Sequence, residues 1–128
     1  MTIKRIEDAT STLGIMTEIL KEVKSQRVKW GEQNHPSLDP HLERSGGRGE
    51  AMNAYYKIPS EELAKQLVTR ALKNDRLTWA HIAIEELCEA IGAKSGPDMR
   101  AELIQTAAVL VSWINSIDRN SEVHNDQG

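Results

Sequence analysis

The sequence predicts an all-α protein built as a four-helix bundle. Apolar residues recur at spacings of three and four in several segments, and no segment alternates between apolar and polar residues for long enough to form a strand. Glycine and proline cluster between the periodic segments, as expected of helix ends and connections. Hydrophobic residues make up 39% of the 128 residues, which is enough to build one compact core.

The first helix is expected over residues 12 to 30, and residues 1 to 10 are polar and expected to be loosely ordered. Gly31 and Pro36 follow the periodic segment and indicate where the helix ends. The residues that recur at helical spacing are Leu13, Met16, Leu20, Val23, Arg27 and Trp30.

A long connection is expected over residues 31 to 59, where no apolar period persists and proline and glycine recur. Connections of this length in compact domains are usually functional or disordered. We therefore expect a loop or lid here, with a short helical piece over 50 to 56. A floppy surface loop is the alternative interpretation.

Three further helices are expected in the second half of the chain. Ser60 caps a helix that runs to about Asn74, and Thr78 caps a helix over 79 to 93. The last helix is expected over 97 to 118. Residues 1 to 118 would then form a single domain, followed by a flexible tail over 119 to 128.

Composition narrows the classes of function. The formal net charge of −3 does not suggest binding to polymeric nucleic acid. The uncharged run from Leu103 to Ile117 is too short to span a membrane, which takes about 20 apolar residues. That run instead favours a central helix or a subunit interface. The single Cys88 and the absence of a targeting signal favour a cytoplasmic protein.

An acidic cluster is the most informative chemical feature of the chain. On a helix, Glu85, Glu86 and Glu89 fall within an arc of about 100°, so the three carboxylates share one face. Like charges one turn apart repel each other, and something should offset this repulsion. Acidic clusters are also common on solvated helix surfaces, which is the simpler interpretation.

The next predicted helix carries an isolated acid, Glu102, on an otherwise apolar face, with the amide of Gln105 one turn further on. An isolated carboxylate in apolar surroundings is normally protonated, paired or bound to a cation. If the two helices form a hairpin, these residues and the first acidic cluster create an oxygen-rich pocket. Mg²⁺ fits such a pocket, with Mn²⁺ as the alternative ion and a phosphate ester as a further ligand.

These motifs resemble those of the MazG-like all-α nucleoside triphosphate pyrophosphohydrolases. Glu85, Glu86 and Glu89, followed after twelve residues by Glu102 and Gln105, look like the family's two acidic helical motifs. The segment from Lys29 to Pro36 and the pair Thr78-Trp79 are also similar to segments of that family. The resemblance covers most of residues 12 to 118, and it implies a MazG-like four-helix bundle that is completed by oligomerisation into a dimer or tetramer.

The resemblance implies hydrolysis of a nucleoside triphosphate between the α and β phosphates. We expect Glu86, Glu89 and Glu102 to hold Mg²⁺, Glu85 to position or deprotonate the attacking water, and Gln105 to be a weak ligand. The family's motif has Asp where Gln105 stands. Three interpretations stay open: a site of lower charge, substitution by Asp98 or a lid acid, or nucleotide binding without hydrolysis.

Residues at the end of the first helix are candidates for a base pocket. Trp30 could stack on a nucleobase, and Gln33, Asn34 and His35 could hydrogen-bond to its edge. Core packing is the alternative for Trp30, and an ordinary loop histidine is the alternative for His35. Candidate phosphate contacts, for which solvated surface charge is the alternative, are Lys29, Lys73 and Arg76.

Two other functions compete with the enzymatic one. Gln105 favours a non-catalytic nucleotide-binding or regulatory helical oligomer. The uncharged last helix would also suit a purely structural oligomer. Because a chain this small leaves apolar helix faces uncovered, we expect a homodimer or homotetramer under any of these functions.

Overall fold

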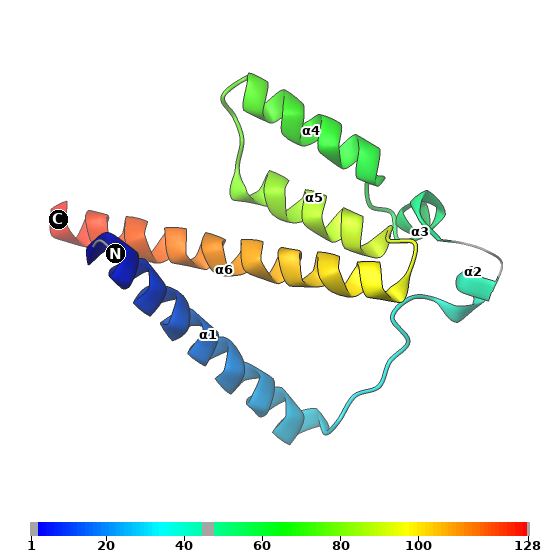
Figure 1. Ribbon diagram of the computed structural model, residues 1–128, viewed down its shortest axis with the longest axis horizontal. Coiled ribbons are helices and arrows are strands. Elements are labelled where there is room, and N and C mark those ends of the chain that lie inside the picture. Colours follow the sequence, from blue (N-terminus) through cyan, green and yellow to red (C-terminus); the bar gives the residue numbers. More distant parts are fainter. Residues whose placement is uncertain (1–2, 45–47, 128) are drawn as a thin grey trace. The chain divides into compact units, whose positions relative to one another are not determined.

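The computed structural model describes residues 3–44 and 48–127, and in these residues it contains six α-helices and no strand. The expected all-α class is confirmed, with 77% of the chain helical. Figure 1 shows the helices in chain order. Their bounds are α1 Ile3–Trp30, α2 Pro40–Arg44, α3 Glu50–Tyr55, α4 Glu61–Lys73, α5 Trp79–Ile91 and α6 Gly96–Gln127.

The chain divides into two compact units, which are described separately. The first unit comprises residues 1–35 and 111–128, and so contains α1 and the second part of α6. The second unit comprises residues 36–110, with α2 to α5 and the first part of α6. The predicted domain over 1 to 118 takes in parts of both units and stays a prediction. All of the acidic residues singled out above lie in the second unit.

Two helices are longer than the sequence predicts. α1 begins at Ile3 rather than near residue 12, and α6 extends to Gln127 rather than ending near 118, so the expected helix bounds are wrong at these two ends. Neither added segment contains glycine or proline, so nothing in them interrupts a helix that has already formed. The remaining parts of the expected segments, residues 1–2, 45–47 and 128, lie outside the described residues.

The expected loop over 31 to 59 contains two short helices. α3 confirms the helical piece expected over 50 to 56, whereas α2 was not expected. Asp39 caps α2, because its Oδ1 accepts hydrogen bonds from the backbone N–H groups of His41 and Leu42 at 2.9 and 3.3 Å. Asp39 also ties α2 to α3, since Tyr55 donates its hydroxyl to Asp39 Oδ2 at 2.7 Å. That hydrogen bond lowers the pKa of Asp39.

The helices that carry the acidic residues begin at the predicted caps. Ser60 Oγ accepts a hydrogen bond from Leu63 N at the start of α4. Thr78 Oγ1 accepts one from His81 N, and His81 Nδ1 accepts one from Thr78 N, which forms a capping box at the start of α5. In Figure 1 α4 and α5 run antiparallel side by side, and the first part of α6 packs along α5.

A buried asparagine fixes the carboxyl-terminal end of α5 against α3. Asn53 is 1% exposed, and its Nδ2 donates to the carbonyl oxygens of Pro59 and Cys88 at 2.8 and 2.9 Å. Its Oδ1 faces Gly92, where an added Cβ would lie only 2.5 Å away. The adjoining core cluster consists of Leu38, Met52, Ala93 and Met99, with Leu42 and Ile91 packed against it. These contacts position the last turn of α5, which carries Glu89.

Large apolar side chains remain exposed on every long helix. In the second unit they include Leu67 on α4, Ile84 and Leu87 on α5, and Ile104 on α6. None of the helices in the described residues is both long enough and apolar enough to cross a membrane. Contiguous exposed apolar faces are typical of surfaces that contact other protein chains.

Candidate metal centre

Three carboxylates from two helices converge in the second unit. Glu86 and Glu89 project from α5 and Glu102 projects from α6, and one carboxylate oxygen of each lies within 4.8 Å of the others. All three residues are half-buried. We call Glu86, Glu89 and Glu102 the carboxylate triad. The antiparallel packing of α5 and α6 therefore brings the isolated acid of α6 to the acidic face of α5.

Two oxygen atoms of the carboxylate triad have no partner. Glu86 Oε2 and Glu102 Oε2 are buried and accept no hydrogen bond from any described residue. Burying a carboxylate oxygen removes its hydration, and without a hydrogen-bond donor in the protein this costs free energy. Such atoms are normally satisfied by a proton or a cation. The triad thus has the donor chemistry of a site for a hard divalent cation.

The raised pKa values of the carboxylate triad also indicate that its three carboxyl groups do not all ionise readily without a cation. Burial, followed by the charges of Glu86 and Glu102 and by a hydrogen bond with Glu102, raises the pKa of Glu89 to about 7. Burial, and then the charges of Glu102 and Glu85, also raises the pKa of Glu86. At neutral pH the metal-free triad is therefore partly protonated.

The raised pKa of Glu89 predicts how the stability of the metal-free protein depends on pH. A carboxyl group whose pKa rises on folding, here from 4.5 to about 7, favours the folded state fully below pH 4.5. That contribution is lost as the pH rises through about 7. We expect the free energy of unfolding in EDTA to fall between pH 5 and pH 8. Urea denaturation across this range measures it.

The variant Glu89→Gln is the matched comparison for this pH dependence. The amide that replaces the carboxyl group does not titrate. The free energy of unfolding of the variant should therefore fall much less than that of wild type between pH 5 and pH 8. Glu18→Gln, which removes an exposed carboxylate of α1 in the first unit, should keep the wild-type profile. Identical profiles for wild type and Glu89→Gln would contradict the assignment of the raised pKa.

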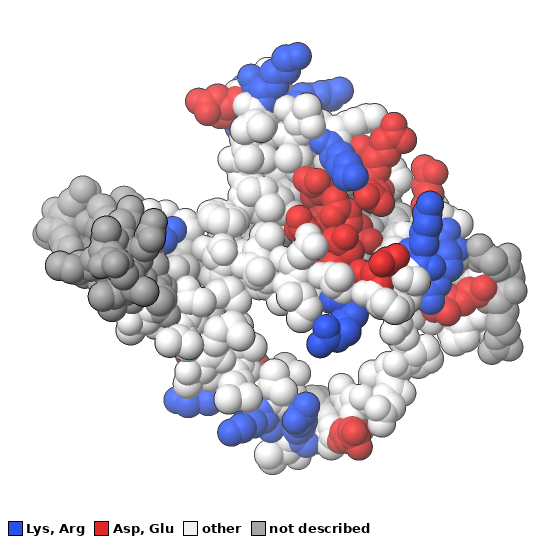
Figure 2. Space-filling view, viewed as in Figure 1, with Lys and Arg blue, Asp and Glu red and all other residues white. Residues whose placement is uncertain are grey.

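A cavity opens beside the carboxylate triad. It has a volume of about 240 Å³ and is lined by residues of α4, α5 and α6 and of the turn between α5 and α6. Figure 2 shows acidic side chains gathered in one patch on this unit, with basic side chains next to it. The cavity therefore gives an ion at the triad room for an additional ligand. Its lining residues are Glu61, Glu89, Gly92, Ala93, Lys94, Asp98, Ala101 and Glu102.

Glu85 and Gln105 are not among the three converging carboxylates. Glu85 is half-buried, and its charge contributes to the raised pKa values of Glu86 and Glu89, but it is not one of the three converging carboxylates. Gln105 is exposed on α6 and does not line the cavity. The catalytic role expected for Glu85 and the ligand role expected for Gln105 stay predictions.

The predicted base-pocket residues lie in the first unit. Trp30 is 62% exposed, so the alternative interpretation of core packing does not hold within a single chain. The Nζ of Lys29 lies 4.9 Å from the centroid of its ring, a cation–π arrangement. Gln33 lines a cavity of about 510 Å³ at the end of α1, and Asn34 and His35 are exposed. Substrate binding by these five residues stays a prediction.

Lys73 and Arg76 do not line the cavity beside the carboxylate triad. Lys73 borders a different, open cavity of about 500 Å³ along α4, together with Lys65 and Arg70. Arg76 is exposed in the connection between α4 and α5. The lysines next to the acidic residues are instead Lys65 and Lys94, which sequence reasoning missed. Lys94 lies three residues after the last residue of the helix that carries Glu89, and that position in the sequence was the available signal.

Comparison of the chain with protein-family models, with curated proteins and with solved structures finds no match.

Proposed function

We propose that this protein is a cytoplasmic, Mg²⁺-dependent nucleoside triphosphate pyrophosphohydrolase of the MazG-like type. The substrate is cleaved between the α and β phosphates, giving a nucleoside monophosphate and pyrophosphate. One observation carries the proposal: Glu86 and Glu89 of α5 converge with Glu102 of α6, and two of their oxygens are buried without a partner. The order and spacing of these acids in the sequence supply the family resemblance.

The carboxylate triad fits a hard divalent cation. Its unpartnered oxygens are the ligand type that Mg²⁺ and Mn²⁺ prefer, and Glu86, Glu89 and Glu102 would hold the ion. When bound, the ion would offset phosphate charge and lower the pKa of water. Glu85, next to the triad, would orient the attacking water and accept its proton. The water oxygen then bonds to the α phosphorus as the bond to the bridging oxygen breaks.

An oligomeric assembly is part of this proposal. The four long helices α1, α4, α5 and α6 would correspond to the four helices of a MazG-like bundle, and the exposed apolar residues would be covered by further copies of the chain. Leu13, Leu72 and Ile104, for example, are 67%, 64% and 57% exposed. Light scattering coupled to gel filtration should report a dimer or tetramer, and a monomer would contradict this part.

The function is tested by a product screen. The purified protein is incubated with each of the common dNTPs and NTPs and Mg²⁺, and products are separated by anion-exchange chromatography. We expect a monophosphate and pyrophosphate from at least one substrate, and no turnover in EDTA. Orthophosphate release, turnover that survives Glu89→Ala, or no turnover of any substrate would contradict the proposal.

Gln105 favours a second candidate function, nucleotide binding without turnover. A neutral amide stands where the family's motif has an acid, and it is exposed on α6. Calorimetry with a non-hydrolysable triphosphate and Mg²⁺ separates the two functions. Binding of the analogue, with no product formed from the natural nucleotides, would favour the second candidate.

A further inference from the structure

The short helix α3 packs at the turn that joins the two helices of the carboxylate triad. Met52 of α3 is 0% exposed and belongs to the core cluster that also contains Ala93 of this turn and Met99 of α6. Glu102 follows Met99 by only three residues on the same helix. The position of α3 is therefore linked by packing to the part of α6 that carries a triad carboxylate.

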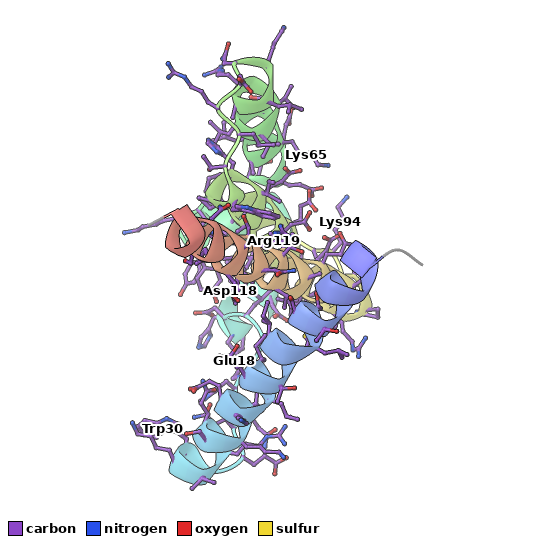
Figure 3. All side chains as sticks on the ribbon, turned by 90° about the vertical axis from the view of Figure 1, so that its left-hand side faces the viewer. Glu18, Trp30, Lys65, Lys94, Asp118 and Arg119 are labelled. Carbon is purple, nitrogen blue, oxygen red and sulfur yellow. The ribbon has the colours of Figure 1, made fainter. Side chains whose placement is uncertain are left out.

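The buried side of this turn lies against α3. Gly92 and Ala93 are buried, whereas Lys94, which is labelled in Figure 3, is exposed. A Cβ added to Gly92 would lie 2.5 Å from Asn53 Oδ1. A Cβ added to Gly49, the residue before α3, would lie 3.8 Å from the carbonyl oxygen of Gly92. The backbone of α3 and that of the turn are thus in close contact.

Asn53 holds the peptide unit that leads into Glu89. Its Nδ2 donates to the carbonyl oxygen of Cys88 at 2.9 Å, and that carbonyl belongs to the same planar peptide unit as the nitrogen and Cα of Glu89. Nδ2 also donates to the carbonyl oxygen of Pro59 at 2.8 Å, which fixes the plane of the Asn53 amide. Asn53 and Cys88 are each 1% exposed, so water does not compete for this hydrogen bond. A displacement of Asn53 would therefore move the backbone of Glu89.

We propose that Asn53 is a positioning residue of the carboxylate triad, and that α3 thereby sets how tightly the triad binds its divalent cation. The inference rests on the proposed function, of which the metal centre is a part. One oxygen of Glu89 lies within 4.8 Å of oxygens of Glu86 and Glu102, so a shift of Glu89 changes the geometry of the whole triad. Loss of a residue that orients a metal ligand typically weakens metal binding by about tenfold or more.

The coupling between α3 and the triad is reciprocal by thermodynamic linkage. If detachment of α3 weakens cation binding, a bound cation holds α3 on α5 more firmly by the same factor. Opening of α3 would then release the cation. This gives the connection over residues 31 to 59 a regulatory role, because α3 is the part of it that contacts the site.

The first test measures Mn²⁺ affinity by electron paramagnetic resonance at pH 8. Asn53→Ala should bind Mn²⁺ about tenfold more weakly than wild type. Ile15→Ala is the matched control, because Ile15 of α1 lies in the first unit, is 3% exposed, and should cost a comparable amount of stability when it is truncated. This control should keep the wild-type affinity. Both variants are compared with wild type at a temperature at which circular dichroism shows all three to be folded.

Hydrogen exchange of the wild-type protein provides a second test that needs no variant. Saturating Mg²⁺ should slow the exchange of the backbone amides of α3 about tenfold relative to EDTA, since linkage requires the same factor as for metal binding. Residues 12 to 20 of α1 should exchange equally fast in both conditions. Unchanged exchange in α3, or equal slowing of both segments, would overturn the inference.

The outcomes separate this inference from the proposed function. Turnover and Mn²⁺ binding by wild type, with wild-type affinity in Asn53→Ala or equal weakening in Ile15→Ala, would overturn the inference alone. Weakening confined to Asn53→Ala, in a protein that hydrolyses nothing, would support the positioning role and contradict the proposed reaction. Absence of Mn²⁺ binding by wild type would overturn both.

Discussion

Glu89→Gln is expected to lower turnover by at least about a thousandfold while leaving the metal-free protein at least as stable as wild type at pH 8. The two effects have one cause. Burial, and then repulsion by the charges of Glu86 and Glu102, disfavours the ionised Glu89 in the folded protein, so replacing it by a neutral amide stabilises the metal-free protein at pH 8. The same repulsion is what a divalent cation would neutralise. Product formation measures the first effect and urea denaturation in EDTA the second.

The opposite signs of these two effects make the result specific to a charged site. A residue needed only for packing would lose activity and stability together when it is replaced. Glu18→Gln, which removes an exposed carboxylate of α1, should change neither quantity. A Glu89→Gln protein that is markedly less stable than wild type at pH 8, or that turns over at the wild-type rate, would be inconsistent with this account.

Gly92→Ala is expected to destabilise the protein by about 2–4 kcal/mol, although it adds only one methyl group. The added Cβ would lie 2.5 Å from Asn53 Oδ1, well inside van der Waals contact. Asn53 would have to move and give up its hydrogen bonds to Pro59 and Cys88. Urea denaturation at pH 6 in EDTA measures the change.

A double-mutant cycle tests the cause of this effect. Asn53→Ala alone should also be destabilising by about 2–4 kcal/mol, because it leaves the carbonyls of Pro59 and Cys88 without a donor. In that background Gly92→Ala should cost less than in wild type, since Asn53 Oδ1 is gone and the close contact of the added Cβ that remains is the one with Cys88 O, at 3.1 Å. Additive effects of the two substitutions would show that the close approach of Asn53 to Gly92 is not the cause.

The features that sequence reasoning predicted correctly depend on local chemistry. The caps at Ser60 and Thr78 depend on hydrogen bonds within one turn, and both are present. The shared face of Glu86 and Glu89 follows from the helical period alone. Predicting the convergence with Glu102 needs one more assumption, that two consecutive helices pack antiparallel. A short turn between two helices usually gives this packing.

The features that it missed depend on contacts between distant segments. Asn53 holds the carbonyl of Cys88, 35 residues away, and no local pattern distinguishes it from an ordinary polar residue of a short helix. Lys65 adjoins the acidic cluster only because α4 packs on α5. The helix α2 is different, because Asp39 followed by Pro40 is a recognisable start signal that was available in the sequence.

The segment from Lys29 to His35 shows the limit of reasoning from a stripe of apolar residues. Trp30 completes the stripe of the first helix, which predicts either core packing or a ligand contact. In the single chain Trp30 is exposed, as are Leu13, Met16 and Leu20 of the same stripe. A helical period identifies a face of a helix but not what covers it. Its partner in this protein would be supplied by the proposed oligomer.

The most direct test of the central claim is a titration of Mn²⁺ followed by electron paramagnetic resonance, because the signal of the free ion disappears on binding. Wild type should bind Mn²⁺ saturably and in competition with Mg²⁺, more tightly at pH 8 than at pH 6, since Glu89 with a pKa of about 7 must lose its proton. The triple variant Glu86→Gln, Glu89→Gln, Glu102→Gln should not bind the ion. Wild-type binding in the triple variant, or no binding by wild type at pH 8, would contradict the claim that these three carboxylates form a metal centre.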